Sequence, residues 1–134
     1  MSDTCIFCEK NFPEESGIFF ENNAYYSKWE KYPVSPGHVL IVSQRHAGSI
    51  FDLTSDEFSQ MQEAIIRAKK IVDKKYEPDG YNIGINDGKA AGQTIPHLHI
   101  HLIPRYNGDI NNPIGGVRNI IPEKGDYTKI HAQI

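Results

Sequence analysis

The sequence predicts an α+β domain in which an antiparallel sheet of about five strands is backed by one long helix. Two observations lead to this prediction. Short runs rich in β-branched and aromatic residues recur between turn residues, and one long segment carries apolar residues at helical spacing. With 134 residues, the chain has the length of one domain that buries its own core, so we expect a single domain over residues 1–134.

The first three expected strands lie in the N-terminal half. Residues 18–21 and 24–29 flank an Asn-Asn pair, which tolerates positive φ and suits a hairpin turn. A connection rich in Pro and Gly then leads to residues 38–43, an apolar, β-branched run typical of an inner strand.

The long helix follows. Thr54 and Glu57 have the spacing of a capping box. Apolar residues then recur at alternating steps of three and four, as in one buried stripe: Phe58, Met61, Ile65, Ala68 and Val72. We expect the helix to end near Tyr76, before Pro78 and Gly80.

Residues 81–85 are the next expected strand, followed by a loop of small residues over 86–92. In the most informative segment, residues 97–101, His alternates with Leu or Ile. Because strand side chains alternate between two faces, the three imidazoles would share one face. Such an array can bind a metal, transfer protons or attack phosphorus; the alternative is a half-solvated, His-rich strand. After Arg105 we expect an ordered arm of low regularity.

Composition excludes several classes of function. The net charge of -3 disfavours binding to nucleic acid or anionic membranes through charge alone. No stretch approaches the roughly 20 apolar residues of a membrane helix, and the first residues lack the basic flank and apolar run of a signal peptide. We therefore expect a cytoplasmic protein without a nucleic-acid or membrane partner.

The two cysteines, Cys5 and Cys8, have C-x-x-C spacing. In a reducing compartment a structural disulfide is disfavoured, which leaves a redox pair or half of a metal site. A thioredoxin-like pair would follow a strand and open a long helix, whereas this pair lies near the N-terminus with Pro13 soon after. The sequence therefore favours a metal site.

Residues 93–103 resemble the signature of the histidine triad (HIT) family, His-x-His-x-His followed by apolar residues. Other segments resemble HIT landmarks in the same order: residues 5–8, 36–42, 45–46, 86–88, 92–94, 115–118 and 121–124. The last two resemble the tail of a bacterial-type branch. The resemblance covers most of residues 5–124 and implies a HIT-like fold with a short N-terminal helix beside the long one.

The resemblance implies hydrolysis or transfer of nucleotides at the α-phosphate through a covalent nucleotidyl-histidine. His99 would be the nucleophile, and His101 would hold a phosphate oxygen. A neutral imidazole attacks phosphorus near neutral pH, and water can cleave the resulting phosphoramidate. Attack also requires an oriented ring, typically through a hydrogen bond from its other nitrogen to a backbone carbonyl.

By the same resemblance, Asn86, Gln93 and Thr94 would contact the phosphate or the leaving group. Such preorganised donors stabilise the charge that develops in the transition state. His38 matches a position that supports the backbone around the nucleophile; a buried structural histidine is the alternative.

Ile6 and Phe7 match apolar positions that contact the base. Glu30 stands where the family usually holds the ribose hydroxyls with Asp or Asn, so its longer side chain shifts the reach of the acceptor. Lys28 and Lys31 occupy positions that are often apolar in relatives that bind adenine, and they could lie over the base or point away from it.

Several HIT proteins with an N-terminal C-x-x-C resemble galactose-1-phosphate uridylyltransferases in binding zinc. The matching residues here are Cys5, Cys8, His46 and His97. Two thiolates and two imidazoles fill a tetrahedral set, so the ion would be structural and would fix the segment beside the nucleophile. Free cysteines and a surface histidine are the alternative.

We therefore expect a zinc-containing, homodimeric HIT hydrolase whose two domains form a continuous sheet. The expected substrates are purine nucleotides with a second group on the α-phosphate, either dinucleoside polyphosphates or nucleoside phosphoramidates. An added divalent ion such as Mg²⁺ is compatible with polyphosphates, although no carboxylate cluster requires it. The alternatives are a nucleotidyltransferase with an acceptor other than water and a non-enzymatic nucleotide-binding protein.

Overall fold

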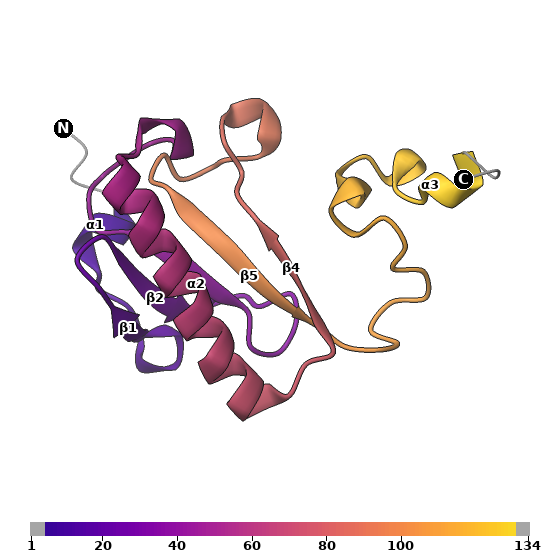
Figure 1. Ribbon diagram of the computed structural model, residues 1–134, viewed down its shortest axis with the longest axis horizontal. Helices are drawn as coiled ribbons and strands as arrows, with labels where there is room; N and C mark the ends of the chain where they lie inside the picture. The colour runs from indigo at the N-terminus through magenta and orange to yellow at the C-terminus, as the bar shows by residue number, and fades with distance from the viewer. Residues whose placement is uncertain (1–4, 131–134) are drawn as a thin grey trace.

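The computed structural model describes residues 5–130, which form an antiparallel five-stranded sheet with one long helix on one face (Figure 1). The strands are β1 (Ile18–Glu21), β2 (Tyr25–Trp29), β3 (Val39–Ser43), β4 (Gly80–Gly84) and β5 (His99–Arg105). Their order in the sheet is β1-β2-β3-β5-β4, and all neighbours are antiparallel. The predicted fold class is confirmed.

The long helix, α2 (Ser55–Tyr76), begins and ends where the sequence predicts. The hydroxyl of Thr54 accepts a hydrogen bond from the Glu57 backbone N–H, and the Glu57 carboxylate accepts one from the Thr54 N–H. The predicted stripe is wrong at Phe58, which is 46% exposed; the buried positions are Met61, Ala64, Ala68 and Val72. The predicted pattern repeats every 3.5 residues and therefore drifts around a straight helix of 3.6 residues per turn.

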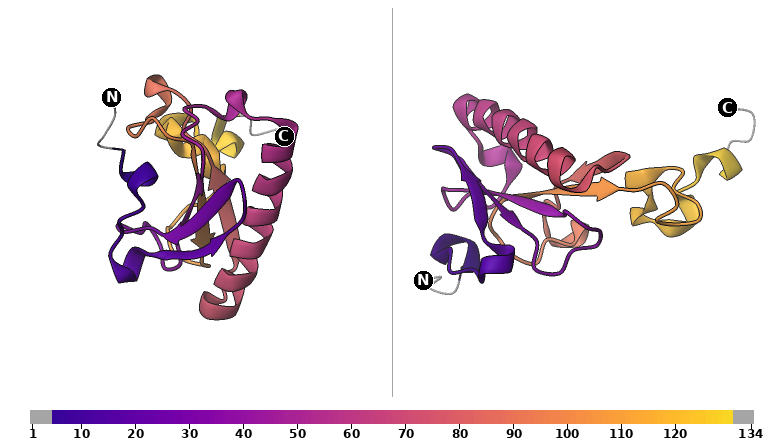
Figure 2. Two further views of the ribbon diagram at one scale, coloured as in Figure 1. Left: turned by 90° about the vertical axis from the view of Figure 1, so that its left-hand side faces the viewer. Right: turned by 90° about the horizontal axis from the view of Figure 1, so that it is seen from below.

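The two faces of the sheet carry separate apolar clusters. One packs against α2 and includes Tyr25, Ile41, Leu98 and Ile100. The other joins Tyr26, Leu40 and Val42 of the sheet to Cys5 and Phe7 of the N-terminal segment. Figure 2 shows α2 and the short helix α1 (Ile6–Glu9) on opposite sides of the sheet. The N-terminal segment thus covers the face that α2 leaves open.

The strand predicted for the histidine segment contains His99 and His101 but not His97. The His97 backbone N–H donates to the Ile95 carbonyl at 2.8 Å, a tight turn that an extended strand excludes. The Leu98 N–H then donates to the Ala47 carbonyl at 2.7 Å, so a loop beyond β3 takes the place of a strand partner.

Beyond β5 the chain forms the predicted arm of low regularity, which extends past the β4 edge of the sheet (Figure 1). Its elements are the 3₁₀ turns Gly116–Ile120 and Pro122–Lys124 and the short helix α3 (Tyr127–Ile130). No helix in the described part of the chain has the length and hydropathy needed to cross a membrane. The predicted domain limits fall at residues 1 and 134, outside the described residues.

Candidate functional site

Strand register places the candidate site on the face opposite α2. Tyr26 pairs with Val42, which pairs with His99; in the next row, Lys28 pairs with Leu40, which pairs with His101. Because side chains alternate along each strand, these residues share one face of the sheet. Each row spans three strands, so its outer residues lie about 10 Å apart.

A cavity of about 510 Å³ opens on this face. It is lined by seven of the predicted site residues: Ile6, Phe7, Glu30, Asn86, Thr94, His99 and His101. Phe12 and Lys28 also line the cavity. Lys28 and Lys31, which the resemblance placed near the base, thus both lie in the cavity wall, whereas no sequence signal pointed to Phe12.

The ring of His99 is oriented by its own strand. Its Nδ1 lies 2.8 Å from the His97 carbonyl oxygen. A carbonyl only accepts, so Nδ1 carries the proton and Nε2 of the neutral ring holds a lone pair. The Phe7 ring packs at 5.0 Å between centroids and limits the orientations of the His99 ring. Through Nε2, this imidazole can act as a nucleophile or accept a hydrogen bond.

The hydrogen bonds of His38 determine which ring nitrogen of His101 carries the proton. The Val34 N–H donates to Nδ1 of His38 at 3.2 Å, so the proton of the neutral His38 ring is on Nε2. That N–H donates to Nδ1 of His101 at 3.0 Å, which leaves the His101 proton on Nε2. Burial lowers the pKa of both rings, and the pKa of His101 falls to about 4, so both stay neutral. His101 can then donate through Nε2, and His38 supports it directly.

Gln93 holds the loop that precedes the histidine segment. Its Oε1 accepts from the Gly88 N–H at 2.8 Å, and its Nε2 donates to the Gly48 carbonyl at 3.0 Å. Gly88 and Gly92 have φ angles of 94° and 93°, which favour glycine. Both ends of the carboxamide are therefore engaged within the protein, whereas Asn86 and Thr94 face the cavity.

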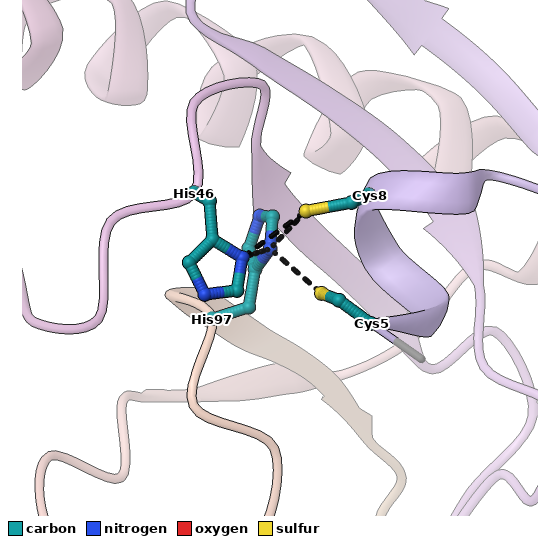
Figure 3. A group of neighbouring side chains, drawn as sticks. All are labelled: Cys5, Cys8, His46 and His97. Atoms are coloured by element: carbon teal, nitrogen blue, oxygen red, sulfur yellow. Dashed lines mark hydrogen bonds between the residues drawn. The ribbon is translucent and has the colours of Figure 1, made fainter. Parts of the chain in front are cut away.

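A second cluster of side chains includes His97, whose backbone carbonyl accepts the hydrogen bond from His99 (Figure 3). It contains Cys5 and Cys8 from the N-terminal segment, His46 from the loop after β3, and His97. One ligand atom from each lies within 4.8 Å of the other three. The structure thus brings together all four residues predicted as metal ligands.

The geometry of this cluster fits Zn²⁺. A tetrahedral ion with Zn–S of about 2.3 Å and Zn–N of about 2.0 Å separates its ligand atoms by roughly 3.3–3.8 Å. Here Nδ1 of His97 lies 3.3 Å from Cys5 Sγ, 3.5 Å from Cys8 Sγ and 3.1 Å from His46 Nδ1. Its Nε2 donates to the Ser43 carbonyl at 2.7 Å. The Nδ1 lone pair therefore faces the cluster, as a metal ligand requires.

Comparison with known proteins supplies independent information. The model of the HIT domain matches residues 11–108. The chain is 35% identical over 100 residues to a bis(5'-nucleosyl)-tetraphosphatase [asymmetrical] of Schizosaccharomyces pombe, covering 75% of this chain and 55% of the relative. It is 39% identical over 98 residues to a bis(5'-adenosyl)-triphosphatase of Dictyostelium discoideum, covering 73% and 66%. An AP-4-A phosphorylase of Mycobacterium tuberculosis is 33% identical over 113 residues, covering 82% and 57%.

The chain thus spans between about half and two thirds of the length of these curated relatives. Among solved structures, a Zn-bound histidine triad family protein from Mycobacterium smegmatis superimposes with a TM-score of 0.70 at 31% identity, covering 81% of this chain and 80% of that one. A HIT family protein from Bacillus subtilis has a TM-score of 0.71 at 26% identity, covering 98% and 94%.

Proposed function

This chain belongs to the histidine triad (HIT) family, and we propose that it hydrolyses purine nucleotides at the α-phosphate through a covalent nucleotidyl-histidine on His99. The substrates would be dinucleoside polyphosphates or nucleoside phosphoramidates. The observation that carries this proposal is the hydrogen bond between His99 Nδ1 and the His97 carbonyl. Because Nδ1 is engaged in this bond, the lone pair of Nε2 would be available to attack a phosphorus bound in the cavity.

The reaction consists of two displacements. Nε2 of His99 forms a bond to the α-phosphorus while the bond from that phosphorus to the bridging oxygen or nitrogen breaks, and the leaving group departs with the bonding electrons. A water oxygen then attacks the same phosphorus and releases a proton to the solvent. The P–N bond breaks, its electrons return to Nε2, and the nucleoside monophosphate leaves.

The surrounding residues would stabilise these steps. The Nε2–H of His101 is proposed to donate to a non-bridging phosphate oxygen, where negative charge increases in the transition state. Thr94 and Asn86 are proposed to contact the phosphate or the leaving group. Ile6 and Phe7 would contact the base, and Glu30 the ribose. For Gln93 we propose a role in holding the loop of residues 86–92. A direct contact with the phosphate is the alternative, and it is the role that the resemblance implies.

A transferase remains the second candidate because one relative is an AP-4-A phosphorylase. If inorganic phosphate replaces water in the second step, the product is a nucleoside diphosphate and the residues of the first step are unchanged. Product analysis in phosphate buffer and in phosphate-free buffer distinguishes the two reactions. An added divalent ion such as Mg²⁺ is a prediction for polyphosphate substrates only.

We also propose that Cys5, Cys8, His46 and His97 hold one structural Zn²⁺ per chain. The bound ion would fix the position of the N-terminal segment, whose Phe7 packs against the ring of His99. It would leave no ligand position for substrate, because the four protein ligands complete the tetrahedron.

We further propose a homodimer formed through the β4 edge. Within the described residues β4 pairs only with β5, so a row of its backbone N–H and C=O groups faces outward. Ile83 on this strand is 48% exposed, and Val117 and Ile120 of the arm are 59% and 83% exposed. A second copy would cover both surfaces.

Trapping of the intermediate tests the proposed function. The protein would be mixed with excess diadenosine tetraphosphate, quenched under denaturing, alkaline conditions that preserve P–N bonds, and measured as intact mass. We expect an adenylyl adduct that maps to His99 and is absent from His99→Gln. Turnover by His99→Gln at the wild-type rate would disprove the mechanism.

A further inference from the structure

Lys28 places a buried positive charge in the wall of the substrate cavity. Its side chain comes from β2, is only 3% exposed, and lines the cavity together with Phe12 and Glu30. The Nζ atom donates to the Trp29 carbonyl at 2.7 Å and lies 4.5 Å from the centre of the Phe12 ring. The ammonium group is thus held in place between a backbone acceptor and an aromatic face.

The hydrogen bonds of this ammonium are incomplete. A protonated lysine has three donors, and the interactions found among residues 5–130 supply one oxygen acceptor and one aromatic ring. No carboxylate in the described part of the chain forms an ion pair with Lys28. Burial lowers the pKa of Lys28, and the nearby Glu30 carboxylate only partly opposes this shift. A buried charge with unfilled hydrogen bonds raises the free energy of the protein. A ligand that accepts a hydrogen bond from this ammonium would therefore bind more tightly.

The position of Lys28 identifies the part of a nucleotide that it would meet. In the sheet it stands in the row of Leu40 and His101, two strands away from the proposed phosphate donor. Its neighbours in the cavity wall include the apolar side chains of Phe12 and Leu40, which suit the faces of a base. A nucleotide with its phosphate at His99 and His101 would therefore extend its base toward Lys28.

We propose that Lys28 makes this cavity selective for purines that carry a carbonyl oxygen at position 6, guanine or hypoxanthine, over adenine. The inference rests on the proposed function and specifies its substrate class. A 6-carbonyl accepts hydrogen bonds, and a lysine ammonium donates them. Adenine presents an amino donor at the same position, which would leave the ammonium without an acceptor. The pairing supplies the acceptor that the site lacks.

Equilibrium binding of inosine 5'-monophosphate and adenosine 5'-monophosphate tests the proposal, because their bases differ only in the group and protonation around position 6. We expect calorimetry to give about tenfold tighter binding of the inosine nucleotide, as one charge-assisted hydrogen bond provides. In Lys28→Met, which keeps an unbranched side chain shorter by only the terminal atom and removes its charge, the ratio should fall to about one.

Lys75→Met is the matched control. Lys75 is an exposed lysine of α2 whose Nζ lies 4.9 Å from the Trp29 ring centre, and it does not line the cavity. This variant should keep the wild-type preference. A lysine with a purely structural role would weaken binding of both nucleotides equally when replaced, as would a lysine that binds phosphate. The proposed selectivity is therefore wrong if Lys28→Met weakens binding of both nucleotides equally, or if the wild type binds both with equal affinity.

The adduct experiment separates this proposal from the proposed function. An adduct on His99 with equal use of inosine and adenosine substrates would leave the hydrolase standing and remove the selectivity. If Lys28→Met alters the preference in binding but no adduct forms on any substrate, the selectivity stands and the covalent mechanism fails. If neither nucleotide binds, the selectivity is wrong, and the adduct experiment alone decides whether the hydrolase mechanism stands.

Discussion

The carbonyl oxygen of His97 accepts a 2.8 Å hydrogen bond from Nδ1 of His99, while the imidazole of His97 belongs to the cluster with the two cysteines. One residue therefore contributes its backbone to the proposed nucleophile and its side chain to the proposed zinc site. A metal ion that restrains the His97 ring would also restrain the carbonyl that orients His99.

Loss of zinc should consequently reduce catalysis without changing any residue of the cavity. In Cys8→Ser we expect less than one zinc per chain and a kcat lowered about tenfold, as for disturbed groups around metal ligands. We also expect a lower melting temperature, because metal binding contributes free energy to the folded state. Elemental analysis, steady-state kinetics and calorimetry measure the three quantities. Wild-type protein purified without chelator that contains no zinc would disprove the site.

The pair formed by His38 and His101 gives a second prediction. His101→Leu removes the proposed phosphate donor and should lower kcat by about 10²–10³-fold, the usual effect of deleting one such donor. His38→Leu keeps the donor but removes the N–H that fixes its tautomer, so we expect a smaller decrease in kcat.

Steady-state kinetics distinguish this role from one in ground-state binding. Both substitutions should affect kcat more than KM, because the His101 hydrogen bond is proposed to strengthen in the transition state. A rise in KM with kcat unchanged would show that His101 binds the ground state and the transition state equally.

Stability should depend on pH through His101. Its pKa in the folded state is about 4, lowered from 6.5 mainly by burial and then by the charges of His99 and His38. Between these two values the unfolded chain binds a proton that the native state does not. The stabilisation is therefore complete above about pH 6.5 and decreases as the pH falls toward 4.

Urea unfolding at several pH values, with wild type compared to His101→Asn, isolates this contribution. Across the window the wild type should lose on the order of 2 kcal/mol more than the variant in free energy of unfolding. Loss of zinc at low pH affects both proteins and cancels in the comparison. Parallel curves for the two proteins would mean that His101 is not held neutral by burial.

The sequence predicts some of these features well because their causes are local. The capping box of α2 depends only on Thr54 and Glu57, and the alternation in β5 places His99 and His101 on one face. The late start of β5 could not be predicted in this way, because the backbone of Leu98 donates to Ala47, in a loop distant in sequence. Contacts between distant segments, rather than local propensity, decide such positions.

The same distinction applies to the candidate site. Resemblance to a family identified the four cluster residues, but only the fold shows that Nε2 of His97 donates to Ser43. The engaged carboxamide of Gln93 likewise depends on Gly48, which lies 45 residues away in the sequence. The buried ammonium of Lys28 follows from the N-terminal segment, which brings Phe12 over β2.

The proposed dimer gives the last prediction. Ile83→Asp places a charge on the exposed side of the β4 edge, where a second copy would have to desolvate it. We expect the dissociation constant of the dimer to rise at least about tenfold, since burial of one aliphatic side chain contributes about 1.5–3 kcal/mol. Size-exclusion chromatography with light scattering over a range of concentrations measures this shift. Arg67→Asp is the control for the introduced carboxylate, because Arg67 is exposed on α2 and its guanidinium lies over the Phe20 ring of β1, at the opposite edge of the sheet. If both variants behave like the wild type, the copies associate through another surface or the protein is a monomer, and the light-scattering mass distinguishes these two results.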